Sequence, residues 1–294
     1  MNKVTLAGHN QELVICPELG GSVLAYNVTV AKVKRTILRD STQAKAVLDT
    51  CNFPLVPYSN RIKKGSFPWQ GQLIKLPLNF SPETGTIHGH GWEKNWQIVS
   101  QTAEKLVIEY NYQADEWPFD YHAEQVFELT ETGLINTLSI KNLSDKPMPT
   151  GLGFHPYFFR TPLCKMSVDA EKMWAVDSEC LPTQLVDIPE GLNDKTGRVV
   201  NSLAIDNCLT GFKKHACITW PEWQVKTEII ASSACDFVVV YSPENENFVC
   251  IEPVTHCTDA FNMQANNIEN TGTVSLPGHE TMTISMALHT SELI

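Results

Sequence analysis

The chain has 294 residues, of which 43% are hydrophobic and 19% are charged. This composition is typical of a folded globular protein with a sizeable core, and it excludes a disordered chain. The formal net charge of −11 at pH 7 argues against nucleic acid or an anionic membrane surface as the main partner.

The cysteine content indicates the compartment. Nine cysteines, an odd number, and no Cys-x-x-Cys pair favour reduced thiols over a disulfide framework. The first residues carry no apolar export signal, and the apolar run at 237–241 is too short to span a bilayer. We therefore expect a cytoplasmic protein without membrane contact.

Alternating apolar and polar residues, separated by turn formers, predict β-strands along most of the chain. Proceeding from the N-terminus, the expected strands are 3–7, 12–16, 22–28, 66–69, 72–76, 97–99, 106–112, 122–129, 134–141, 215–220, 224–231, 236–241 and 248–252.

Two further segments complete the fold prediction. Residues 273–276 and 281–288, joined by a Pro-Gly turn, predict a closing hairpin, whereas residues 171–203 predict long loops or a short helix. No segment keeps a 3.6-residue period over three turns, so helices should be few and short. The sequence predicts an all-β protein, one large antiparallel β-sandwich domain over residues 1–294.

The most informative motif is Gly-Leu-Gly-Phe-His-Pro-Tyr-Phe at residues 151–158. Pro156 holds the backbone next to His155, and the two glycines leave room for close backbone approach or for a ligand. A histidine among aromatic residues is commonly a hydrogen-bonded core residue, so His155 alone does not indicate a catalyst.

Two earlier motifs present polar side chains. Residues 51–62 contain two closely spaced prolines that keep the chain extended and deliver Asn60 and Arg61 at its polar end. Arg61 fits either a ligand contact or a surface ion pair. His88 and His90 stand between glycines, and without a nearby carboxylate or thiolate this pattern favours hydrogen bonding to a polar ligand over a metal.

Glu252 is a carboxylate inside an otherwise apolar strand end. Burial of such a group is costly unless it is hydrogen-bonded or paired, and proteins that tolerate it often use it as a base. A hydrogen bond to its own turn through Thr255 is the alternative explanation.

Four blocks taken together resemble the aldose 1-epimerase (galactose mutarotase) family, in its shorter bacterial-type branch. They are Pro-Tyr-Ser-Asn-Arg-Ile at 57–62, Ile-His-Gly-His-Gly-Trp at 87–92, Gly-Phe-His-Pro-Tyr-Phe at 153–158, and Ile-Glu-Pro-Val-Thr-His-Cys-Thr-Asp-Ala-Phe-Asn at 251–262. They occur in the family's order, so the resemblance covers essentially the whole chain and implies the galactose mutarotase-like supersandwich fold.

The resemblance also implies residue roles. His155 resembles the general acid that protonates the ring oxygen, and Glu252 resembles the base that deprotonates the C1 hydroxyl. Arg61 and His88 resemble the residues that hold sugar hydroxyls, as does Asp206, although Leu209 replaces the aromatic residue of that family motif.

Further roles follow from residue type. Trp92, Tyr157 or Phe154 would offer an apolar surface to the sugar, with core packing as the alternative for each. We expect Asp259 to hold the loop after the catalytic glutamate, and His90 and His256 to be structural.

A carboxylate and an imidazole suit anomer interconversion, because their pKa values allow both protonation states near neutral pH. No metal or organic cofactor is needed. A glycosidase would require two carboxylates facing one bond. A mutarotase for a phosphorylated sugar would require extra cationic side chains, and a non-catalytic sugar-binding protein would not need both His155 and Glu252. The sequence does not indicate the oligomeric state.

Overall fold

The computed structural model describes residues 1–293, and it confirms an all-β fold built from large antiparallel sheets. Twelve strands form the larger sheet. Its main order is β1 (Val4–Gly8), β2 (Gln11–Cys16), β3 (Ser22–Val30), β4 (Val33–Leu38), β16 (Tyr157–Phe159), β25 (Phe248–Val254), β24 (Phe237–Ser242), β21 (Ile205–Thr210), β18 (Lys172–Val176) and β19 (Pro182–Val186), while β5 (Pro54–Leu55) and β15 (Gly153–Phe154) pair off this path.

Nine strands form the second sheet. Their order is β10 (Gln97–Gln101), β11 (Lys105–Tyr112), β12 (Tyr121–Thr130), β13 (Gly133–Asn142), β27 (Thr281–Glu292), β23 (Val225–Ala231), β22 (His215–Trp220), β17 (Lys165–Val168) and β20 (Arg198–Val199).

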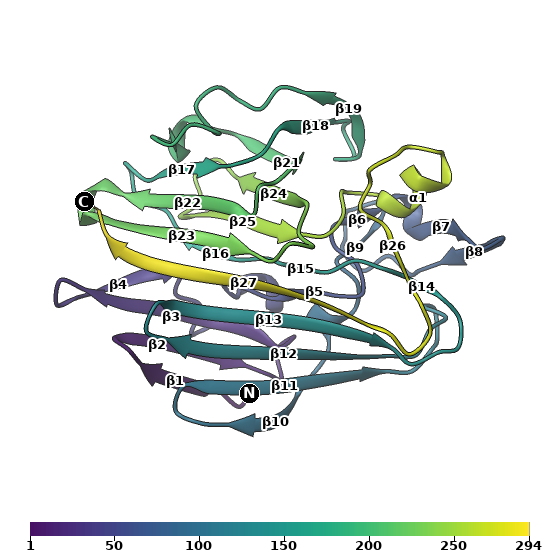
Figure 1. Ribbon diagram of the computed structural model, residues 1–294, viewed down its shortest axis with the longest axis horizontal. Coiled ribbons are helices and arrows are strands. Elements are labelled where there is room, and N and C mark those ends of the chain that lie inside the picture. The colour runs from purple at the N-terminus through teal and green to yellow at the C-terminus, as the bar shows by residue number, and fades with distance from the viewer. Residues whose placement is uncertain (294) are drawn as a thin grey trace.

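Short elements make up the remainder. Three small antiparallel pairs are β14 (Met148–Thr150) with β26 (Val274–Leu276), β6 (Arg61–Ile62) with β9 (Thr86–Ile87), and β7 (Ser66–Trp69) with β8 (Gln72–Lys75). The helices are α1 (Ala260–Ala265) and the 3₁₀ turns η1 (Val47–Asp49), η2 (Lys63–Gly65), η3 (Gly91–Glu93), η4 (Val200–Ser202) and η5 (Pro221–Trp223). Figure 1 shows α1 and the strands β6 to β9 gathered at the right end of the molecule.

The larger sheet is buried on both of its faces around β25. Because successive side chains of a strand point to opposite faces, Val249 and Ile251 join the main core between the two sheets. Phe248, Cys250 and Val254 point the other way, into a second apolar cluster. This explains why residues 248–254 are apolar almost without a break. Glu252 shares the face of the second cluster.

The second apolar cluster belongs to a layer outside the sandwich. Phe53, Leu55, Ile87 and Trp92 come from the long connection between β4 and β10, and they cover the outward face of β16, β25 and β24. The connection therefore covers one face of the larger sheet. The candidate site lies beneath it.

One prediction about the chain is partly right and another is wrong. Residues 171–203 contain loops and the short 3₁₀ turn η4, as expected, but they also contain β20 of the second sheet and β18 and β19, which extend the larger sheet. Their side chains are mostly half-buried or exposed, so no clear apolar alternation marked them.

The predicted closing hairpin does not form. β26 pairs with β14, whereas β27 pairs with β13 on one side and β23 on the other. The buried side chains of β27, such as Ile284 and Met286, belong to the main core, and this burial between two long strands fixes its partners.

Candidate active site

A cavity of about 320 Å³ lies between the outer face of the larger sheet and the connection that covers it. The structure brings eight of the site residues considered from the sequence to its walls. They are Asn60, Arg61, His88, Trp92, His155, Tyr157, Asp206 and Glu252. Its other lining residues are Arg39, Leu48, Phe80, Glu83, Ile87, Val239, Tyr241 and Phe248. The volume falls in the range of small-molecule sites.

Glu252 lies in β25 with only 2% of its surface exposed. Its Oε2 atom has no hydrogen-bond partner among the described residues. Thr255 does not supply one; the hydrogen bond found at its hydroxyl comes from the Leu152 N–H, which the hydroxyl accepts. Burial raises the pKa of Glu252 well above its usual value, and the nearby charge of Asp206 raises it further. The side chain is therefore a buried carboxyl group with a free oxygen beside the cavity.

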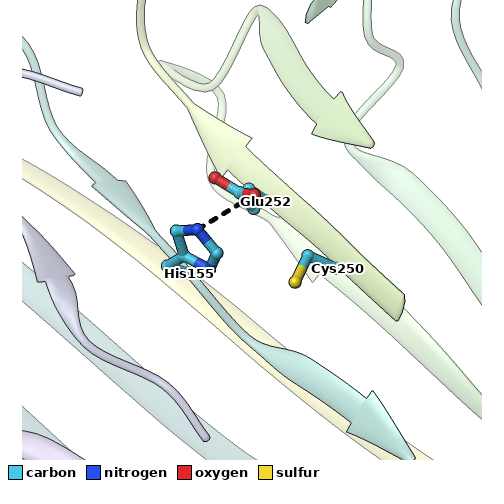
Figure 2. Close-up of side chains that lie close together, drawn as sticks. All are labelled: His155, Cys250 and Glu252. Atoms are coloured by element: carbon cyan, nitrogen blue, oxygen red, sulfur yellow. Dashed lines mark ion pairs between the residues drawn. The ribbon is translucent and has the colours of Figure 1, made fainter. Parts of the chain in front are cut away.

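His155 faces Glu252, and the two side chains point toward each other (Figure 2). The His155 Nε2 atom lies 3.4 Å from Glu252 Oε1. The imidazole is stacked between Phe53 and Tyr157, with ring centroids 4.6 Å from each. Burial lowers the pKa of His155 to about 3, and the charge of Arg39 lowers it further.

The pair holds one ionisable proton between its two members. A neutral imidazole beside a protonated carboxyl has the same net charge as an imidazolium beside a carboxylate. Both pKa shifts favour the neutral form of the pair in the empty cavity. Transfer of the proton across the 3.4 Å gap between Nε2 and Oε1 gives the charged form without exchange with solvent.

The glycines before His155 serve close packing. A Cβ atom on Gly151 would lie 1.7 Å from Cδ2 of His256, and one on Gly153 would lie 2.7 Å from Val254 Cγ1. Of the two explanations left open by the sequence, close approach is correct for both positions. It brings the segment onto β25, where Gly153 pairs with Val254.

His88 is oriented by Asn60. The Nδ1 atom of His88 accepts a hydrogen bond from the Asn60 N–H at 3.1 Å, and the His88 N–H donates to the Asn60 carbonyl at 3.0 Å. Because Nδ1 is an acceptor, the neutral ring carries its proton on Nε2. Burial lowers the pKa of His88 well below its usual value, so the ring stays neutral and Nε2–H is a donor.

Arg61 is the centre of an ion-pair group. Its Nε and Nη2 atoms donate to the two carboxylate oxygens of Glu83, each at 3.0 Å, and Nη2 lies 3.6 Å from Asp206. Its side chain is 13% exposed, so the surface ion pair considered from the sequence is not what forms. Burial raises the pKa of Asp206, and Arg61 opposes that shift.

Arg39 and Phe248 were missed by the sequence reasoning. The Arg39 guanidinium carbon lies 3.8 Å from the Tyr157 ring centroid and 4.6 Å from that of Phe248. Its Nε atom donates to the Thr50 carbonyl at 2.9 Å. Phe248 had a signal, since it lies four positions before Glu252 in one strand and so shares its face. Arg39 follows β4, a strand the sequence did not predict.

Two of the three aromatic candidates line the cavity and the third does not. Trp92 and Tyr157 line the cavity, and Trp92 stacks on Phe53 with centroids 5.6 Å apart. Phe154 is instead fully buried in the main core, so packing explains it. We find no cavity contact for it.

The remaining polar candidates make contacts with other parts of the chain. His256 accepts a hydrogen bond from the Ser59 N–H, and His90 contacts the Tyr121 hydroxyl. Asp259 accepts hydrogen bonds from the Lys63 N–H at 2.9 Å and the Asn262 side chain at 2.7 Å.

Comparison with solved structures supports the fold. The chain superposes on a putative aldose 1-epimerase from Escherichia coli K12 with a TM-score of 0.89 and 24% identity, covering 99% of each chain. It superposes on a galactose mutarotase-like protein from Clostridium acetobutylicum with a TM-score of 0.87 and 22% identity, covering 99% of this chain and 95% of that one.

Comparison of sequences establishes the family. The model of the aldose 1-epimerase family matches residues 2–289, and the chain belongs to this family. It is also 28% identical to the uncharacterized protein YphB of E. coli K12 over 231 residues, which is 76% of this chain and 79% of that protein. In the described part of the chain, no helix has the length and apolar character needed to cross a bilayer.

Proposed function

We propose that this protein is an aldose 1-epimerase that interconverts the α and β anomers of a free aldohexose such as galactose or glucose. The observation that carries the proposal is the buried pair of His155 and Glu252, 3.4 Å apart at the wall of a sugar-sized cavity. Each has a side-chain atom without a partner among residues 1–293, His155 Nδ1 and Glu252 Oε2. Buried polar atoms without a partner are uncommon, and a catalytic role is one reason for a protein to keep them.

The reaction needs one base and one acid at adjacent atoms of the sugar. Glu252, as a carboxylate, removes the proton of the C1 hydroxyl while His155, as an imidazolium, donates a proton to the ring oxygen. The C1–O5 bond breaks and gives the open aldehyde. After rotation about C1–C2, His155 removes the proton from the O5 hydroxyl and Glu252 returns a proton to O1, so that the ring closes as the other anomer.

The pair's protonation suits this exchange. The pair enters the reaction with one proton and leaves with one, so turnover requires no exchange with solvent. Burial favours the neutral form in the empty cavity. Hydrogen bonds from bound sugar hydroxyls to the free carboxylate oxygen would favour the charged form instead. Each of the two groups should contribute roughly 10²–10⁴-fold to the rate.

The other cavity residues would bind the sugar. His88 would donate from Nε2, while Arg61 and Asp206 would contact hydroxyls as donor and acceptor. Asn60 fixes the His88 ring, and Trp92 and Tyr157 offer apolar surface to the C–H face. The chemistry assigned to these side chains uses neither a metal nor an organic cofactor. The cytoplasmic location remains part of the proposal and rests on the cysteine content.

Polarimetry on freshly dissolved α-D-galactose and α-D-glucose tests the proposal. The wild type should speed the approach to anomeric equilibrium, and Glu252→Gln and His155→Asn should each lose roughly 10²–10⁴-fold of that acceleration. Sugar binding without any acceleration by the wild type would contradict the proposal and indicate a sugar-binding protein instead.

Arg39 gives one observation in favour of a second candidate, a mutarotase for a sugar with an acidic substituent. Arg61 faces Glu83 and Asp206, whereas Arg39 forms no ion pair within residues 1–293 and lines the same cavity. The extra cation that the sequence analysis did not find is therefore present. If this candidate is correct, glucuronate or glucose 6-phosphate should be a better substrate than glucose, and Arg39→Gln should abolish that preference. A wild type that prefers the neutral sugars would exclude it.

A further inference from the structure

A third side chain lies beside the proposed catalytic pair. Cys250 is two residues before Glu252 in β25, so both side chains leave the same face of the strand. Figure 2 shows Cys250, Glu252 and His155 close together. Their ligand atoms, a thiol sulfur, a carboxylate oxygen and an imidazole nitrogen, all lie within 4.8 Å of one another. Cys250 is fully buried and does not line the sugar cavity.

We propose that His155, Cys250 and Glu252 form a binding site for a thiophilic divalent cation such as Zn²⁺, and that the bound ion blocks the sugar reaction. The binding part of this proposal stands independently of the proposed function, and only the inhibition part rests on it.

The geometry suits a small tetrahedral ion. Zinc bonds of about 2.0–2.3 Å place neighbouring ligand atoms of a tetrahedron about 3.3–3.6 Å apart. The His155 Nε2 and Glu252 Oε1 atoms are already 3.4 Å apart. The Cys250 sulfur lies within 4.8 Å of these two atoms. A small adjustment of its side chain would bring it to the spacing that a tetrahedral zinc site requires. Because His155 and Glu252 line the cavity, an ion can enter through it, and a water molecule can fill the fourth position.

The chemistry of the donors selects the kind of ion. A thiolate with an imidazole favours zinc, cobalt or copper over magnesium or calcium. Burial lowers the pKa of His155, so the ring is neutral and one of its two nitrogens carries no proton and can bind an ion. Burial raises the pKa of the Cys250 thiol, so the ion has to displace the thiol proton as well as the proton held by the pair of His155 and Glu252. A doubly charged ion with one thiolate and one carboxylate is neutral overall, which a buried site tolerates.

The functional consequence follows from the shared residues. An ion held by Glu252 and His155 occupies the lone pairs that the anomer reaction uses. Cys250 takes no part in that reaction, so its removal separates metal binding from catalysis.

The test uses untagged full-length protein, freed of metal with EDTA, and cobalt and zinc salts as probes. Wild type, Cys250→Ser and Cys250→Ala are compared with Cys164→Ser, which changes an equally buried thiol in the main core. Far-ultraviolet circular dichroism and urea denaturation establish that each variant is folded. Binding is measured by the thiolate-to-Co²⁺ charge-transfer absorption and by calorimetry with Zn²⁺.

Wild type and Cys164→Ser should show the thiolate absorption at one ion per chain. Both Cys250 variants should lack it and bind Zn²⁺ at least about tenfold more weakly, since loss of even an outer partner of a metal ligand costs 10–100-fold. No thiolate absorption in the wild type, or equal Zn²⁺ affinity in Cys250→Ser, would overturn the proposal.

Polarimetry supplies the second measurement. Zn²⁺ should stop wild-type mutarotation, EDTA should restore it, and Cys250→Ser should retain turnover at Zn²⁺ concentrations that stop the wild type. Equal inhibition of both proteins would overturn the inhibitory role. If the wild type has no mutarotase activity at all, the proposed function fails, and the absorption and calorimetry still decide whether the metal site exists.

Discussion

The ion pair between Arg61 and Glu83 offers the sharpest test of how the cavity is held together. Glu83→Gln keeps the size of the side chain and one carbonyl oxygen, but it removes the charge that Arg61 faces at two contacts of 3.0 Å. Arg61 and Glu83 expose only 13% and 23% of their side chains, so solvent compensates little of the loss.

The magnitude follows from the number of contacts. A hydrogen bond to a charged group contributes about 1.5–3 kcal/mol, and breaking a buried ion pair costs about 3–5 kcal/mol. Asp206, 3.6 Å from Nη2, still offsets part of the Arg61 charge, and glutamine keeps one acceptor. We therefore expect a loss of about 2 kcal/mol in the free energy of unfolding. Because His155 and Glu252 are untouched, KM for the sugar should rise while kcat changes little.

Urea denaturation measures the first effect and polarimetry the second. Glu128→Gln is a matched control, because the pair of Lys105 and Glu128 is 47% and 43% exposed and should change stability by less than about 1 kcal/mol. If Glu83→Gln lowers the free energy of unfolding by no more than this control does, the ion pair between Arg61 and Glu83 is as weak as a surface ion pair. Glu83 would then not hold the Arg61 guanidinium in place for binding.

Two further predictions concern the packing behind the site. Gly151→Ala should destabilise the protein by about 1–3 kcal/mol or more, because its new methyl group would lie 1.7 Å from the His256 ring. Thermal denaturation measures this loss. An unchanged Tm would show that the ring can move away. Burial lowers the pKa of His256 to about 4 in the folded protein. The unfolded chain therefore binds a proton at this residue more readily than the folded protein does. The free energy of unfolding should fall as the pH drops from 6.5 to about 4. His256→Gln should reduce that slope by up to about 1.4 kcal/mol per pH unit in urea denaturation, and an unchanged slope would show that other groups cause it.

The motifs located the cavity because each one is recognisable from its own residues. Asn60 and His88 adopt left-handed conformations, with φ of 59° and 63°, and they exchange hydrogen bonds with each other. Each motif can be recognised in one chain by its own residues, although the hydrogen bonds between Asn60 and His88 join two segments that lie 28 positions apart. Glu252 was visible for a different reason, as a carboxylate in an apolar strand.

The missed residues depend on contacts that the local sequence does not carry. Glu83 is in a turn-rich segment and gains its role only where Arg61 reaches it. Arg39 faces the cavity because Tyr157 and Phe248 pack beneath its guanidinium. The pairing of β27 similarly follows from burial between β13 and β23, which outweighs a favourable turn sequence between β26 and β27.

Strand β25 is buried on both faces, and mutations on its two faces should have different effects. Val249 and Ile251 support the sandwich core, whereas Phe248 and Glu252 border the cavity from the opposite face of the same strand. A substitution at one of the first two should lower the folded fraction of protein in the cell, while a substitution at Phe248 should alter which ligands the cavity accepts. Selection can therefore change the chemistry of the cavity and the robustness of the fold almost independently, by single substitutions at adjacent codons.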